Sequence, residues 1–104
     1  MLDLKKYQKI SKDLQAGMEQ MQGELAQMSV EGTAGGGALK VVVNGNQEIK
    51  QVQISPEAVD PDDIQMLEDL FRAAANQAIE KSKEIQQESM SKITGGKMPN
   101  LPFL

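Results

Sequence analysis

The fold is decided by residues 39–54, LKVVVNGNQEIKQVQI, which have the pattern of a β-hairpin. Apolar side chains alternate onto one face of the first strand, at Leu39, Val41 and Val43. Val42 makes the opposite face apolar too, as in a strand that is covered on both sides. Asn44-Gly45 is a strong turn signal, and a second strand returns through residues 47–54.

The register of the returning strand stays open at the level of sequence. Ile49 is out of phase with Val52 and Ile54, so either a bulge lies near Lys50-Gln51 or the strand is buried on both faces. A shorter strand is expected at residues 29–33, followed by a flexible Gly-rich link at residues 34–37.

Helical periodicity flanks these strands on both sides. Before them, apolar residues recur at intervals of 4, 3, 4 and 3, which predicts a helix to about Met28 with a narrow seam: Leu14, Met18, Met21, Leu25 and Met28. After them, Asp60 is expected to cap a helix with Pro61 at its first position, running to about Ile93. The prediction is one α+β domain over residues 1–94, with a long N-terminal helix, a three-stranded antiparallel sheet and a long C-terminal helix, and a Gly/Pro-containing tail at 95–104.

The lengths of these elements predict a homodimer with two projecting arms. Helices of about 25 and 33 residues are roughly 37 and 50 Å long, whereas a six-residue strand spans about 20 Å. Both helices must overhang the sheet at the same end, where we expect them to pair as a two-helix arm. The apolar surface at the other end should pack on a second copy through Val41, Val43, Leu67, Leu70, Phe71, Ala74 and Ala78.

Charge is unevenly distributed along the chain. The net charge is -4, from 11 Lys+Arg and 15 Asp+Glu, which excludes a uniformly basic surface. Residues 1–12 hold four Lys and one Asp, and residues 70–104 hold five basic and three acidic residues. Residues 13–31 hold four acids and residues 57–69 hold six, with no base in either block. The predicted shape places the acidic blocks at the base of the dimer and the basic ends on its arms.

Lysines on the arms are therefore the candidate phosphate contacts. Lys5 and Lys6 lie in a first helical turn, where a cation opposes the helix dipole, so helix stability alone does not account for them. The full predicted set is Lys5, Lys6, Lys9, Lys12, Lys81, Lys83 and Lys92.

Composition argues against catalysis. The chain has no His and no Cys, which removes the commonest general base, the commonest metal ligands and the thiolate nucleophile. The glycines at residues 32–37 do not form a phosphate loop, because no Lys-Ser or Lys-Thr pair follows them. We expect no enzyme activity, metal, cofactor or small-molecule substrate. No apolar run approaches the roughly 18 residues of a membrane span, so we expect a cytoplasmic protein without membrane contact.

Five segments together resemble the YbaB/EbfC family of small bacterial nucleoid-associated proteins. They are VEGTAGGG (30–37), KVVVNG (40–45), DPDD (60–63), MLEDL (66–70) and AANQA (74–78). The resemblance covers nearly the whole chain and implies a tweezer-shaped homodimer in the nucleoid that binds DNA between or along its helical arms. It also implies an influence on chromosome organisation and gene expression. The arms carry Lys rather than Arg, which favours phosphate contacts over base readout.

One alternative function belongs to a different class. A protein-interaction or chaperone-like module would use the apolar seam of the first helix and the tail at residues 98–104 to hold a partner peptide. Such binding would survive high salt, whereas phosphate binding would not.

Overall fold

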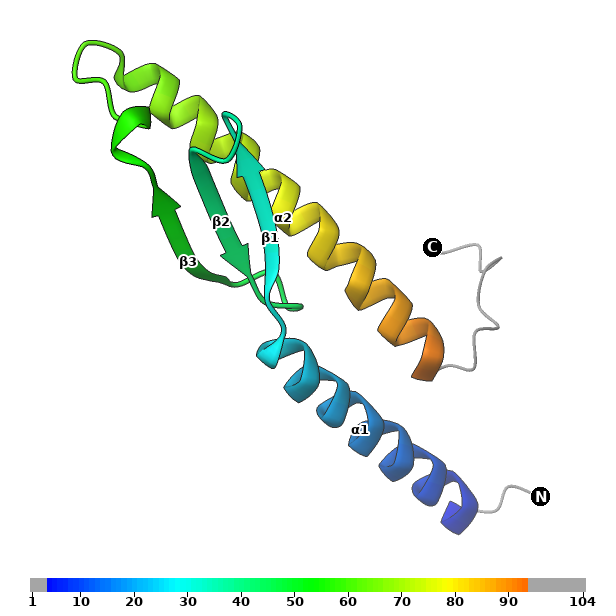
Figure 1. The fold of residues 1–104 in the computed structure, drawn as a ribbon. Coiled ribbons are helices and arrows are strands. Elements are labelled where there is room, and N and C mark those ends of the chain that lie inside the picture. Colours follow the sequence, from blue (N-terminus) through cyan, green and yellow to red (C-terminus); the bar gives the residue numbers. More distant parts are fainter. Residues whose placement is uncertain (1–3, 94–104) are drawn as a thin grey trace, which may run out of the picture.

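Two long helices flank a three-stranded antiparallel sheet in the computed structural model, which describes residues 4–93 (Figure 1). The elements are α1 (Leu4–Gln27), β1 (Val30–Ala34), β2 (Leu39–Val43), β3 (Ile49–Ile54), the short 3-10 helix η1 (Pro56–Ala58) and α2 (Ile64–Ile93). The strand order is β1-β2-β3, which confirms the predicted α+β architecture of the single chain. The predicted tail at 95–104 lies outside the described residues.

A bulge resolves the register of β3. Ile49 lies opposite Val43 while Gln51 lies opposite Val42, which leaves Lys50 as the extra residue. The bulge brings Ile49 onto the same face as Val52 and Ile54. The first of the two alternatives from the sequence is therefore confirmed.

The link between β1 and β2 is a defined turn rather than the flexible connector that its composition suggested. Gly35, Gly36 and Gly37 have φ values of 64°, 67° and 92°, in the left-handed region that a side chain disfavours. The N–H of Ala38 donates to the carbonyl of Gly35 at 3.3 Å and closes the turn. Three consecutive glycines are needed here because all three residues adopt this conformation.

The core lies between α2 and one face of β1 and β2. The sheet contributes Val30, Leu39, Val41 and Val43, and α2 contributes Ala74, Ala75 and Ala78. Small alanines allow α2 to approach the sheet so closely that a Cβ on Gly32 would overlap the carbonyl oxygen of Ala74. Consequently α2 lies over β1 and β2, while every residue of β3 stays exposed.

The helix α2 begins later than predicted. Asp60 does not cap it: its Oδ1 accepts the N–H of Asp62 at 2.9 Å within a turn. Asp63 is the capping residue, since its Oδ1 accepts the N–H of Met66 at 3.1 Å. Pro61 starts this turn rather than the helix.

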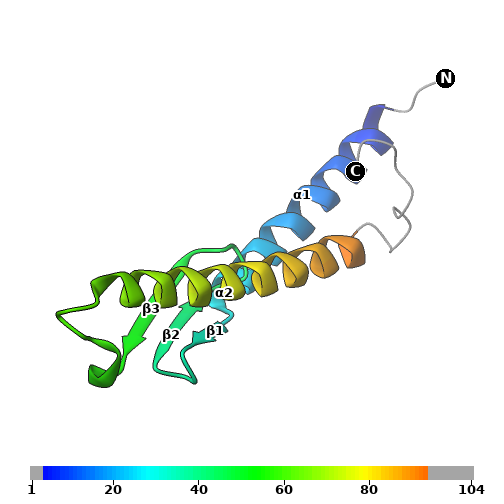
Figure 2. The same ribbon diagram turned by 90° about the horizontal axis from the view of Figure 1, so that it is seen from above.

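Helix α1 projects from the body as a single rod. Met21 and Leu25, near its C-terminal end, are buried, whereas Ile10 is 58% and Leu14 is 48% exposed. The free ends of α1 and α2 lie on the same side of the sheet, as expected (Figure 1), but the two helices diverge from their junction (Figure 2). The prediction of a paired two-helix arm is therefore wrong for the outer half of α1.

Replacing Gly32 with alanine should destabilise the fold by about 3 kcal/mol, because the added methyl meets backbone atoms of α2 that cannot rotate away. The measurement is urea or thermal unfolding followed by circular dichroism. The matched control is Gly23→Ala, where a Cβ meets nothing and should stabilise α1 by up to about 1 kcal/mol. Equal stability of Gly32→Ala and the wild type would contradict the close packing of α2 on β1.

Candidate nucleic-acid interface

Four lysines occupy the first half of α1, the part that projects farthest from the sheet. Lys5, Lys6, Lys9 and Lys12 are all exposed, and residues 4–12 contain no acidic side chain. This makes the outer half of the rod the most concentrated positive surface among the described residues.

Helical geometry turns most of these lysines away from the body. At about 100° per residue, Lys5, Lys9 and Lys12 lie roughly 140° to 180° around α1 from its buried side. That buried side is defined by Met21 and Leu25. The three lysines therefore form a row along the outward face of α1, and Lys6 lies on its flank. A row of ammonium groups on an exposed rod can contact successive phosphates without any pocket.

The lysines predicted on α2 fall into two groups. Lys81 donates from Nζ to the backbone carbonyl of Glu31 at 3.1 Å, so it ties α2 to β1. Lys83 and Lys92 are exposed on the half of α2 that extends past the sheet. The same stretch carries three acids, Glu80, Glu84 and Glu88, which leaves it with no net positive charge. The positive surface is thus centred on α1 rather than shared equally between the helices.

The two acidic blocks also separate in space. The block at residues 57–69 lies around the first turns of α2, at the end of the molecule opposite to the projecting half of α1 (Figure 1). The block at residues 13–31 was expected at the base, but Asp13 and Glu19 lie on the rod itself and are exposed. The basic region of α1 therefore ends at Lys12.

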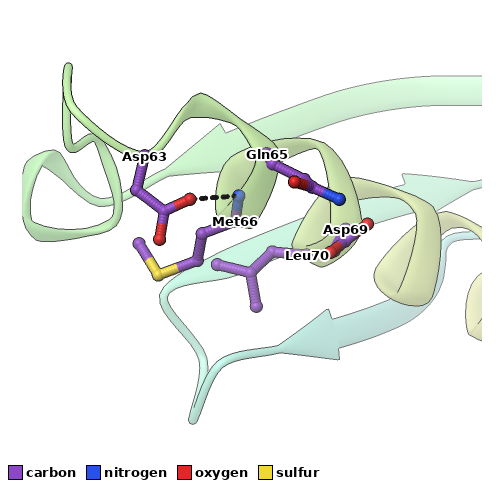
Figure 3. A pocket seen from close by; sticks show the side chains of 5 residues that line it. All are labelled: Asp63, Gln65, Met66, Asp69 and Leu70. Atoms are coloured by element: carbon purple, nitrogen blue, oxygen red, sulfur yellow. Dashed lines mark hydrogen bonds between the residues drawn. The ribbon is translucent and has the colours of Figure 1, made fainter.

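A shallow depression at the first turns of α2 is not suited to an anion. It is lined by Asp63, Gln65, Met66, Asp69 and Leu70 (Figure 3). The carboxylate of Asp63 is engaged with the backbone of Met66, and that of Asp69 pairs with Arg72 at 2.9 Å. Within residues 4–93 no three side chains of the metal-binding types gather into a possible metal site.

The residues predicted for the dimer interface divide between core and surface. Val41, Val43, Ala74 and Ala78 are 0% exposed, so they form the core of the single chain and have no surface to offer a second copy. The reason is that α2 packs on β2 within the same chain. Leu67 and Leu70 are half-buried at the edge of this core, and Phe71 is exposed.

The exposed apolar face of β3 was not predicted from the sequence. Ile49, Val52 and Ile54 are 50%, 40% and 44% exposed, on the same side of the sheet as the core. If a bulge at Lys50 is assumed, the alternation of apolar residues along residues 49–54 predicts this face from the sequence.

Phe71 borders this face from α2. It lies about 60° around the helix from Ala74, on the side away from Gln77, whose Oε1 accepts the N–H of Thr33 in β1. We call Ile49, Val52, Ile54 and Phe71 the open face.

Fold and charge define a class: a small α+β protein with a projecting helix whose outer half is rich in lysine. Residues 1–98 match the YbaB/EbfC DNA-binding family. A nucleoid-associated protein of Acetivibrio thermocellus is 48% identical over 93 residues, covering 89% of this chain and 79% of the relative. Another, of Chloroflexus aurantiacus, is 47% identical over 87 residues, covering 84% and 87%.

The chain belongs to the YbaB/EbfC DNA-binding family. This confirms the resemblance drawn from the sequence and the expectation of a DNA-binding protein rather than an enzyme. The crystal structure of an uncharacterised protein from Helicobacter pylori has the same fold, with a TM-score of 0.82 at 16% identity over 90% of this chain and 99% of that one. No helix within residues 4–93 is both long and apolar enough to cross a membrane.

Proposed function

We propose that this protein is a nucleoid-associated homodimer that holds duplex DNA mainly through phosphate contacts from the outward lysines of α1. The observation that carries the proposal is the row formed by Lys5, Lys9 and Lys12 on the exposed face of a projecting helix. The relatives from Acetivibrio thermocellus and Chloroflexus aurantiacus are named nucleoid-associated proteins, which supports the same cellular role for this protein.

Electrostatics favours this surface over the rest of the chain. DNA presents one negative charge per roughly 1.7 Å of helix axis, and binding releases the counterions that its phosphates condense. A protein of net charge -4 gains more from this the farther its acids lie from the phosphates. The six acids of residues 57–69 lie at the other end of a molecule that extends 72 Å along its longest axis.

The expected mode of binding has little sequence preference. Lysine ammonium groups neutralise phosphates as point charges, and they lack the planar fork with which Arg reads guanine. A dimer would present two such rods and join two positions on DNA. This geometry suits a role in chromosome organisation, with indirect effects on gene expression.

The open face supplies a surface for the second copy. Its four residues are apolar and lie beside the uncovered flank of α2. Three of them belong to β3, an edge strand, whose outer backbone groups have no neighbouring strand to pair with. Leu67 and Leu70 extend the apolar surface along α2. Pairing through this face buries side chains that one protomer leaves in water, which favours a homodimer over a monomer.

The alternative function draws on the unpaired part of the α1 seam. Leu14 of the seam and Ile10, one turn before it, are exposed and could hold an apolar peptide. This binding would depend on buried apolar area and would change little with salt. The titration described next therefore separates the two functions.

Binding to duplex DNA should weaken steeply with salt. With about six phosphates neutralised per dimer, log affinity should fall against log salt with a slope near -5. Fluorescence anisotropy of a labelled duplex at several salt concentrations measures this slope. The double variant Lys9→Ala with Lys12→Ala removes four lysines per dimer and should reduce the slope to about -2 for any DNA sequence.

The control double variant changes net charge by the same amount elsewhere. It combines Lys40→Ala and Lys50→Ala, because Lys40 pairs with Glu31 at 3.7 Å and Lys50 donates to the carbonyl of Met28 at 3.3 Å. Its slope should stay near that of the wild type. Binding that ignores salt, or equal loss in both double variants, would rule out phosphate contacts by α1.

A charge on the open face should dissociate the dimer. Val52→Glu places a carboxylate among apolar side chains, and its burial without a partner is costly, so the protein should elute as a monomer. Gln53→Glu is the matched control: the neighbouring residue faces the other side of β3, opposite Lys40, and should leave the dimer intact. Light scattering after size exclusion gives the mass. A Val52→Glu variant that remains dimeric would exclude the open face as the interface.

A further inference from the structure

The turn between β2 and β3, residues 44–47, lies at the junction of α1 and α2. Its own backbone is tightly held: the side-chain Oδ1 of Asn44 accepts the N–H of Asn46 at 2.8 Å and that of Glu48 at 3.0 Å. The N–H of Asn44 donates to the carbonyl of Glu48 at 2.9 Å, and Asn44 itself is buried. The turn is thus a preformed block rather than a loose loop.

On one side this turn holds the end of α1. The N–H of Gly45 donates to the carbonyl of Leu25 at 2.7 Å, one of the last four carbonyls of the helix, which lack partners within it. Asn46 adds a bond from Nδ2 to the carbonyl of Gln22 at 3.3 Å. The approach is so close that a Cβ on Gly45 would lie 2.8 Å from the Cβ of Leu25.

On its other side the turn is held by one hydroxyl of α2. Ser82 is 0% exposed, and its Oγ donates to the carbonyl of Asn44 at 2.6 Å. The same Oγ accepts from the backbone N–H of Gln47 at 3.3 Å and from its Nε2 at 3.0 Å. Gln47 has a φ of 61°, an unfavourable conformation for a residue with a side chain, and these bonds hold it there.

We infer that Ser82 is a positioning residue for DNA binding: through the turn at 44–47 it sets the direction in which α1 leaves the body. The outer half of α1 diverges from α2 (Figure 2), and Ile10 and Leu14 on it are exposed. The bonds from the turn to Leu25 and Gln22 lie at the base of α1, where they hold its direction relative to the sheet. A small rotation there moves the lysines of the first turns by a large distance. This inference rests on the proposed function, because it concerns the spacing of the phosphate-binding lysines.

Distances between spin labels test the orientation directly. The chain has no cysteine, so labels can be placed at Gln8→Cys on α1 and Gln87→Cys on α2, both exposed. Labelled protein is diluted with unlabelled protein so that pulsed electron resonance reports distances within one protomer. The distribution should be narrow for the parent protein and clearly broader after Ser82→Ala.

Two further variants make this result specific. Asn46→Ala removes the bond to α1 from a partly exposed side chain, so it tests the same connection if Ser82→Ala does not fold, and it should broaden the distribution too. Ser89→Ala, two turns further along α2 and outside the junction, is the matched control and should leave it narrow. Unchanged distributions in Ser82→Ala and Asn46→Ala would overturn the inference.

DNA titrations distinguish lysines that are present but wrongly positioned from lysine–phosphate contacts that have been removed. Ser82→Ala should bind duplex DNA about three- to tenfold more weakly, because the rods must be ordered on binding, while the salt slope stays that of the wild type. Wild-type affinity in this variant, or a reduced slope, would overturn a positioning role. If the wild type itself fails to bind DNA, the proposed function fails, whereas the distance measurement still decides whether Ser82 orients α1.

Discussion

The close contact between α2 and β1 at Gly32 is the constraint on which the rest of the structure depends. Alanines at 74, 75 and 78 and the missing side chain at 32 let the helix lie almost on the strand backbone. A helix seated this far toward β1 covers two strands and leaves the third open. Both the buried core and the exposed apolar face of β3 follow from that one placement.

The order of the elements along the chain separates the acid-rich start of α2 from the lysines of α1. The acid-rich start of α2 and the lysine-rich start of α1 lie at opposite ends of the molecule (Figure 1). The three strands of the sheet separate the two helices in the sequence. Repulsion between the acids and DNA decreases with distance and is screened beyond about 10 Å in ordinary salt. A net charge of -4 is therefore compatible with the proposed binding to DNA, because the charges are unevenly arranged along the long axis.

Much of the fold could be predicted from periodicity and turn chemistry. The helices and the three strands follow from the spacing of the apolar residues. The bulge near Lys50 was one of two alternatives that the position of Ile49 left open, and the strand pairing decides between them. The start of α2 was misplaced because Asp60 and Asp63 are both competent caps, and only the preceding turn decides between them. The divergence of α1 from α2 depends on the junction at Leu25 and Ser82, which no local pattern reveals.

For the candidate site, too, local spacing could be predicted from the sequence and tertiary contacts could not. Lysine positions on α1 can be placed on a helix face from spacing alone, but the bond from Lys81 to the carbonyl of Glu31 requires the tertiary structure. The interface residues were predicted from their hydrophobicity. Hydrophobicity does not distinguish residues buried inside one chain from residues buried between two chains. Val41 and Ala74 proved to belong to the first kind.

The central claim is that DNA lies along the outward face of α1. The most direct measurement is a titration of isotopically labelled protein with a short duplex, followed by amide NMR shifts, which a chain of 104 residues makes practicable. The account predicts the largest changes at residues 5–12, with small ones at residues 57–69. Changes concentrated on β3 or at the start of α2, with α1 unaffected, would contradict it.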